Sequence, residues 1–127
     1  MWSRYLAEFC GTFLMVLLGC GSVAMGWSPI AISVTFGFAV FTAIMIFQPI
    51  SGAHINPAVS IAFAAKGDLE QKALPGYLIA QSLGAWLAAM LVVDGATIPT
   101  VSMPNAWGIE IAITLLLMYS IHGLVRR

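Results

Sequence analysis

The chain has 127 residues, of which 61% are hydrophobic and 8% charged, and its formal net charge is zero. An average globular protein carries about 25% charged residues, so this composition indicates a membrane protein and gives no reason to expect nucleic acid as a partner. Cys10 and Cys20 share one apolar run without the spacing of a metal or redox site, and we interpret them as small packing residues.

Four apolar runs are each long enough to cross about 30 Å of hydrocarbon as a helix. The first run ends at "GWSPI", where Pro29 breaks the helix, and the third begins with Pro75, whose missing N–H costs little in a first turn. A connector rich in Pro, Gly, Ser and Thr precedes the fourth run. The sequence therefore predicts an all-α membrane protein with four transmembrane helices, at about residues 5–25, 30–50, 74–93 and 106–125.

The positive charges fall on one side of this arrangement. With four spans, both ends of the chain and the segment between the second and third spans face the same side of the membrane. All the cations lie in these parts, whereas the acid in the opposite connectors is Asp94. The positive-inside rule therefore predicts that both termini are cytoplasmic. The cations are Arg4, Lys66, Lys72, Arg126 and Arg127.

Small residues recur every four positions in the third run. Such a stripe lets the backbone of a neighbouring helix approach closely, although small residues are also common in membrane helices in general. We expect a helix–helix contact along it, with Ala7 and Gly11 serving the same purpose in the first run. The stripe consists of Gly76, Ala80, Gly84 and Ala88.

Two carboxylates interrupt the apolar runs, Glu8 near the start of the first and Glu110 near the start of the fourth. A charge at the centre of a membrane helix costs about 2.5–3.5 kcal/mol on insertion scales, so such residues face protein or a water-filled cavity. They support a pathway or irregular backbone, or they reach water at the interface. His54 and His122 lie far apart in the sequence, without metal-ligand spacing. We expect no catalytic residues, no metal and no cofactor.

The stretch "SGAHINPAVSIAFAAKG", residues 51–67, is neither a span nor an ordinary loop. Asn56 is a good N-cap and Pro57 a favourable first helical residue, so a helix of about half the bilayer thickness is predicted over residues 57–66. Irregular backbone at membrane depth survives where it lines a cavity or is buried in protein. We predict a re-entrant segment, extended and then helical, typical of a channel or transporter; a cytoplasmic amphipathic turn is the alternative.

Several segments resemble the aquaporin and glycerol-facilitator family, the major intrinsic proteins. "SGAHINPAV" is similar to the family's NPA loop, and "LAEFCGTFLMVLLGCGSV" looks like its first helix. "YLIAQSLGAWLAAMLV" and "GIEIAITLLLMYSIHG" look like its third and fourth helices. The resemblance covers nearly the whole chain and implies a partial aquaporin-like fold with a single-file pore.

The resemblance also implies roles for individual residues. The backbone carbonyls of Gly52, Ala53 and His54 would line the pore. Asn56 would donate to the passing solute, and Pro57 and Ala58 would hold the tip of the half-helix.

Three further residues acquire roles from the resemblance. Glu8 and Glu110 would brace irregular pore loops by accepting their N–H groups. Phe36, in "VTFGF", occupies the position of the family's aromatic selectivity filter, where phenylalanine favours water and tryptophan favours glycerol. Without the resemblance, Phe36 would be interpreted as a lipid-facing or core aromatic residue.

Family members have six spans and two half-helices that form an inverted repeat. Residues 1–93 resemble the first repeat and residues 106–127 the start of the second, so we expect one partial domain over residues 1–127. The fifth and sixth helices, the second NPA motif and the filter arginine have no counterpart in it. An antiparallel pair of copies could supply them, but the one-sided cations argue against this. We expect a partial sequence, a truncated product or a half that needs a complementary chain.

These observations predict a channel rather than an enzyme. We expect passive flow of water or small neutral solutes such as glycerol, once the missing half is supplied. The channel would be integral to a bacterial inner membrane, as a homo-oligomer (a tetramer by resemblance) or with a second-half chain. A non-conducting fragment that only associates with other membrane helices is the alternative. A proton-coupled carrier using Glu8 lacks a second titratable partner.

Overall fold

The computed structural model describes residues 1–125 and divides the chain into two compact units, Met1–Ala96 and a second unit that begins at Thr97. The first unit holds α1 (Trp2–Ala24), α2 (Pro29–Ser51), α3 (Pro57–Lys66), the short 3-10 helix η1 (Gln71–Ala73) and α4 (Leu74–Leu91), and the second holds α5 (Met103–Val125). In the described chain, α1, α2, η1 with α4, and α5 are long and apolar enough to cross a membrane. The predicted all-α fold is confirmed, and α3 covers the predicted half-helix.

The helix ends differ from the predicted ones by a few residues, because hydropathy marks the apolar run and not the caps. Ser28 caps α2 by accepting a hydrogen bond from the Ala31 N–H at 3.3 Å. The same helix continues through Pro49 to Ser51 and stops at Gly52. Helix α5 starts at Met103, earlier than predicted, because a proline in the first turn is compatible with a helix start.

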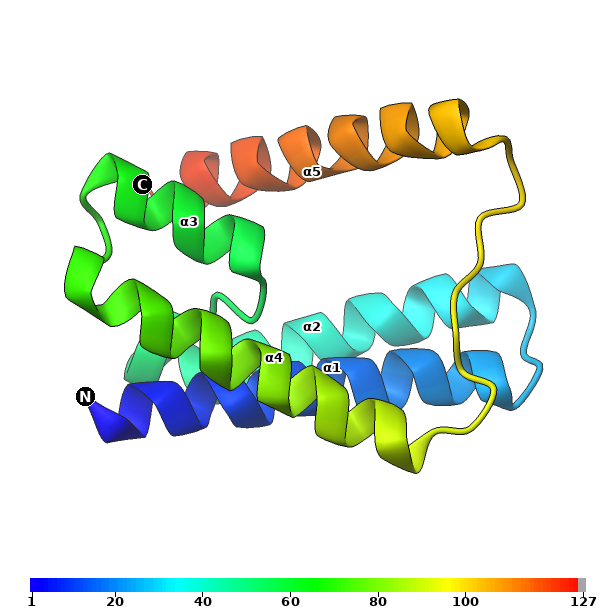
Figure 1. Cartoon of the computed structure of the whole chain (residues 1–127), viewed down its shortest axis with the longest axis horizontal. Helices are drawn as coiled ribbons and strands as arrows, with labels where there is room; N and C mark the ends of the chain where they lie inside the picture. Colours follow the sequence, from blue (N-terminus) through cyan, green and yellow to red (C-terminus); the bar gives the residue numbers. More distant parts are fainter. Residues whose placement is uncertain (126–127) are drawn as a thin grey trace. The chain divides into compact units, whose positions relative to one another are not determined.

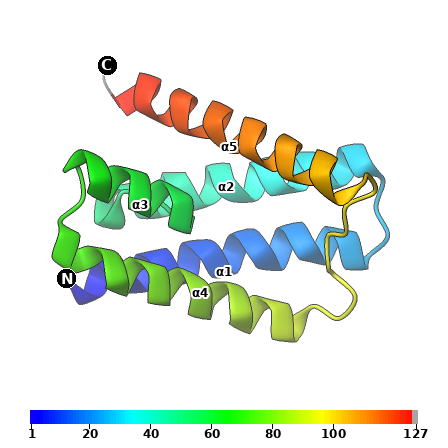
Figure 2. The same ribbon diagram turned by 45° about the horizontal axis from the view of Figure 1, so that its top comes forward.

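In the first unit, α1 packs against both α2 and α4 (Figures 1 and 2). The small residues of α4 make the second contact possible. A Cβ added at Gly84 would lie 2.3 Å from the backbone oxygen of Phe9, and one added at Gly76 would lie 2.4 Å from the Tyr5 ring. The predicted helix–helix contact along this stripe is therefore confirmed.

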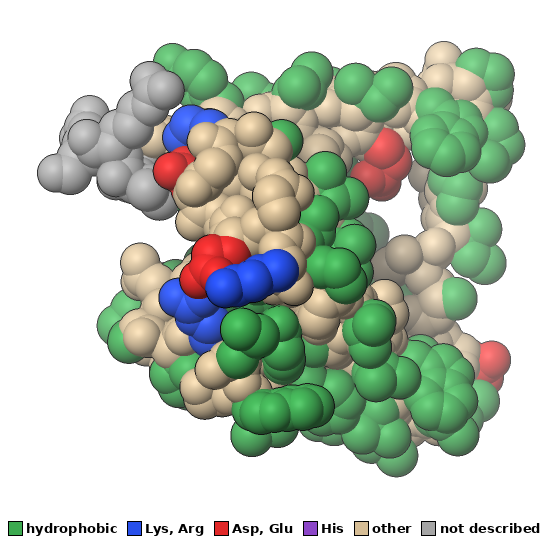
Figure 3. All heavy atoms as spheres, turned by 60° about the vertical axis from the view of Figure 1, so that its left-hand side comes forward, with side chains coloured by type: hydrophobic (Ala, Val, Ile, Leu, Met, Phe, Trp, Pro, Cys, Tyr) green, Lys and Arg blue, Asp and Glu red, His purple; other side chains and the backbone are tan. Residues whose placement is uncertain are grey.

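Charged side chains gather at one end of the first unit, with hydrophobic side chains beside them (Figure 3). Glu70 pairs with Lys72 at 3.0 Å and with Arg4 at 3.9 Å, and Lys66 pairs with Asp68 at 3.0 Å. The hydrogen bond from Lys72, its charge and that of Arg4 hold the pKa of Glu70 below its usual value. Three of the five predicted one-sided cations thus share one end; the other two, at 126 and 127, lie outside the described residues.

Candidate functional site

The segment between α2 and α3 has an unusual backbone. Gly52, Ala53 and Ile55 have φ angles of 89°, 49° and 44°, in the left-handed region. The sequence predicted extended backbone here, which the structure shows at Asn56, with φ −151° and ψ 127°, but not at these three residues. A β-branched residue with positive φ is an outlier that costs of order 1–3 kcal/mol, so surrounding contacts must hold Ile55 in place.

Glu8 of α1 supplies those contacts. Its Oε1 accepts hydrogen bonds from the His54 N–H at 2.9 Å and the Ser51 hydroxyl at 2.7 Å. Its Oε2 accepts from the Ile55 N–H at 2.6 Å and from Gln81 Nε2 at 2.8 Å. The left-handed residues turn two successive N–H groups toward one anion, a geometry known as a backbone nest. Four donors on a fully buried carboxylate compensate the loss of water around it.

Gln81 extends this network and was missed by the sequence interpretation. Its Nε2 also donates to the Ser60 hydroxyl at 2.8 Å, and Ser60 Oγ lies 3.2 Å from Nδ1 of His54. Tyr77, also on α4, donates from its hydroxyl to the Ser51 carbonyl at 2.6 Å. Gln81 and Tyr77 are 1% and 0% exposed. The available signal was the same as for Glu8, namely a polar group inside an apolar span.

The loop therefore uses its N–H groups internally. The N–H of Gly52 donates to Gln48 O, and that of Ala53 to Ser51 Oγ at 3.0 Å, beside the two that Glu8 accepts. By contrast, the hydrogen bonds among residues 1–125 include none to the carbonyl oxygens of Gly52, Ala53 or His54. This part of the backbone is a set of acceptors without a donor in the described part of the chain.

Asn56, next in the chain after Ile55, offers a donor. Its Oδ1 accepts a hydrogen bond from the Ala58 N–H at 2.8 Å, which confirms the predicted N-cap, with Pro57 as the first helical residue. No acceptor among the described residues bonds its Nδ2. Because Oδ1 is fixed by the cap, the amide N–H groups point away from the helix start. Asn56, Pro57 and Ala58 are all at least partly exposed.

A hollow of ≈ 460 Å³ opens beside this loop, within the first unit. Gly52 and His54 of the loop line it together with Tyr77 of α4. At the charged end, Arg4 and Glu70 form part of its wall. A polar hollow therefore connects the charged end of the unit with Gly52 and His54, whose carbonyls have no donor among residues 1–125.

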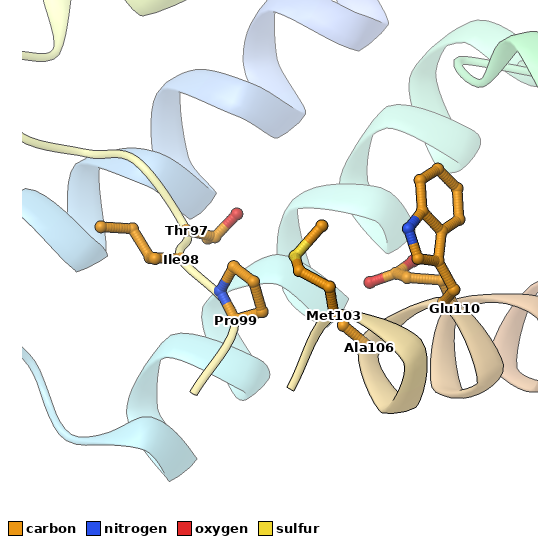
Figure 4. A pocket seen from close by; sticks show the side chains of 7 residues that line it. Thr97, Ile98, Pro99, Met103, Ala106 and Glu110 are labelled. Atoms are coloured by element: carbon orange, nitrogen blue, oxygen red, sulfur yellow. The ribbon is translucent and has the colours of Figure 1, made fainter. Parts of the chain in front are cut away.

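The remaining predicted residues lie elsewhere. Phe36, on α2, is partly buried and packs over Gly19 of α1. Glu110, on α5, is exposed and accepts no hydrogen bond from the described residues. It lines a hollow of ≈ 370 Å³ inside the second unit with Trp107 and the segment 97–99 (Figure 4). Its role as a loop brace stays a prediction.

Comparison with known proteins identifies the class to which this fold and loop belong. The sequence model of the family described as "Major intrinsic protein" matches residues 1–127. "Aquaporin NIP1-1" of Zea mays is 36% identical over 94% of this chain and 48% of its own length. "Probable glycerol uptake facilitator protein" of Thermotoga maritima is 44% identical over 71% and 42%, and "Aquaporin Z" of Rhodopseudomonas palustris is 42% identical over 71% and 40%.

The chain belongs to the major intrinsic protein family. It is an integral membrane protein and not an enzyme, in agreement with the sequence prediction. It spans about half the length or less of the curated relatives that it matches.

Proposed function

We propose that the chain forms part of a channel for passive flow of water or small neutral solutes such as glycerol. The re-entrant loop would line the pathway with the carbonyls of Gly52, Ala53 and His54, and Asn56 would donate to the passing solute. Residues 1–93 would be the first repeat of one partial domain, and residues 106–127 the start of the second. The relatives include proteins named as an aquaporin and as a glycerol uptake facilitator, which supports this range of solutes.

The observation that carries the proposal is the separation of donors and acceptors along the loop. Four successive N–H groups, from Gly52 to Ile55, bond within the protein, whereas three carbonyls have no donor among the described residues. Unpaired carbonyls at membrane depth are costly unless a mobile donor reaches them. Water and polyols carry O–H donors, and a row of carbonyls can replace part of their hydration.

The finer features of the channel follow from the same reasoning. Phe36 would narrow the pathway, and Glu8 and Glu110 would brace its two loops. The charged end with Arg4 and Lys72 would face the cytoplasm of a bacterial cell, with both termini on that side. The chain would assemble as a homo-oligomer, a tetramer by resemblance, or with a complementary second-half chain that completes the pore.

Osmotic shock of proteoliposomes tests the proposal. The chain is reconstituted, and shrinkage is followed by light scattering in a stopped-flow instrument, against empty liposomes of the same lipid and size. We expect a water permeability above that of the empty liposomes, either for the chain alone or with a co-reconstituted second-half chain. The Asn56→Asp variant keeps the cap oxygen but removes the amide donor, and should lose this excess, whereas Asn105→Asp, at an exposed position, should retain it.

Three outcomes would contradict the proposal. Permeability equal to that of empty liposomes both for the chain alone and with a second-half chain would mean that it forms no part of a pore, which favours a fragment that only associates with membrane helices. Equal permeability in the wild type and Asn56→Asp would mean that solute does not pass this amide. Shrinkage without an osmotic gradient that depends on external pH would instead indicate a proton-coupled carrier.

A further inference from the structure

We propose that Gly19 is a positioning residue for solute selectivity, because it fixes where the Phe36 ring lies. The inference rests on the proposed function, in which Phe36 narrows the pathway. It adds a residue on a different helix that touches no solute. Gly19 lies on α1 and is buried, and Phe36 lies on α2 and is partly exposed.

The contact leaves no room for a side chain at position 19. A Cβ there would lie 2.2 Å from Cε1 of Phe36 and 2.4 Å from both Cδ1 and Cζ. Ordinary contact between carbon atoms is about 3.5 Å, so the ring would have to move by about an ångström or more. The three nearest atoms all belong to this one ring. The ring of Phe36 therefore rests directly on the backbone of α1.

The direction of that movement gives the functional consequence. Helix α1 blocks one face of the ring, so an added methyl group pushes the ring away from α1 and toward its exposed side. In the proposed channel that side faces the pathway, and pore diameter is one of the properties that set selectivity. A side chain at position 19 should therefore narrow the constriction, and glycerol should be impeded more than water.

Neighbouring glycines provide matched controls. Gly21 lies on the same helix, and a Cβ added there meets no atom within 4 Å. Gly84 is as tightly packed as Gly19, but against the α1 backbone and not against an aromatic ring. Gly21→Ala therefore reports the effect of alanine on α1, and Gly84→Ala reports the effect of crowding without Phe36.

The experiment compares water and glycerol permeability of proteoliposomes that carry the wild type, Gly19→Ala, Gly21→Ala or Gly84→Ala. We expect a severalfold fall in the ratio of glycerol to water permeability for Gly19→Ala alone. In a Phe36→Ala background, Gly19→Ala should leave that ratio unchanged, since the ring is gone. A ratio that changes equally in both backgrounds, or equally in Gly84→Ala, would overturn the proposal.

A second measurement needs no conduction. A 4-fluorophenylalanine at position 36 reports its ring environment through its fluorine resonance, which Gly19→Ala should shift and Gly21→Ala should not. If Gly19→Ala fails to fold but Gly19→Ala with Phe36→Ala folds, the clash is with the ring, as proposed. Failure of both, or an unmoved resonance, would overturn the assignment. Wild-type liposomes without permeability, both with and without a second-half chain, would contradict the proposed function, while the resonance would still decide whether Gly19 positions the ring.

Discussion

Replacing Glu8 by glutamine changes one oxygen into an amide nitrogen at the centre of the buried network. The carboxylate accepts four hydrogen bonds, two on each oxygen. A glutamine side chain offers one oxygen, which can accept two of them, and its NH₂ group can accept none. Two of the four donors therefore lose their acceptor. They are the Ser51 hydroxyl and the His54 N–H if the nitrogen replaces Oε1, or the Ile55 N–H and the Gln81 amide if it replaces Oε2.

The expected cost follows from that count. A buried donor without a partner costs about 1–3 kcal/mol, so two of them should lower the free energy of unfolding by about 2–6 kcal/mol. SDS titration in mixed micelles, followed by far-UV circular dichroism, measures this change. The change should also reduce the hydrogen-exchange protection of the His54 or the Ile55 N–H group, whichever donated to the replaced oxygen.

Glu110→Gln is the matched control, because it makes the same chemical change at an exposed carboxylate that accepts no hydrogen bond from the described residues. It should alter the free energy of unfolding by no more than about 0.5 kcal/mol. Equal losses in the two variants, or a loss below about 1 kcal/mol for Glu8→Gln, would refute the reasoning, because the loop would then keep its conformation without a full set of acceptors.

Three further predictions concern other contacts of the first unit. Gln81→Leu leaves Ser60 and the carboxylate without the donor that joins them, and should cost about 1–3 kcal/mol in the same SDS titration; an unchanged midpoint would contradict this. Gly84→Ala forces a methyl group against a backbone oxygen of α1 and should cost about 1–3 kcal/mol, which the same titration measures. Lys72→Ala should raise the pKa of Glu70 toward its ordinary value of 4.5, measured by carbon-13 NMR of a labelled carboxyl group. Because the pKa of Glu70 is lower in the folded state than in the unfolded state, its ion pairs stabilise the fold at pH values above the unfolded pKa. The wild type should lose that stabilisation as pH falls through the folded-state pKa. A Glu70 titration curve unchanged by Lys72→Ala would contradict the predicted role of Lys72.

The parts of the fold that depend on nearby residues could be predicted from the sequence. Each long helix follows from a continuous apolar run, and the start of α3 follows from Asn56 and Pro57, a cap and a first-turn residue that act within a few positions. The contact between α1 and α4 follows from the spacing of small residues on α4. In each case the physical cause lies inside the segment itself.

The loop conformation could not be predicted in this way. Ala53 and Ile55 have left-handed φ angles that their own side chains disfavour, so local propensity gives the wrong answer. Their conformation is held from a distance: the Ile55 N–H donates to Glu8, 47 positions earlier in the chain, and Gln81, 73 positions after Glu8, completes the carboxylate's shell. A single sequence identifies these polar groups as unusual in a membrane span, but it does not pair them.

The buried carboxylate also explains why the loop can present acceptors alone. Every peptide unit carries one donor and one acceptor, so an exposed loop normally offers both. Here Glu8 takes the N–H groups of His54 and Ile55, and Ser51 takes that of Ala53. Only the carbonyl side is left for another molecule, and Asn56 adds a single amide donor at the end of the row. In the proposed channel, a solute must therefore both donate to the carbonyls and accept from Asn56, which water and polyols can do and a solute without N–H or O–H groups cannot.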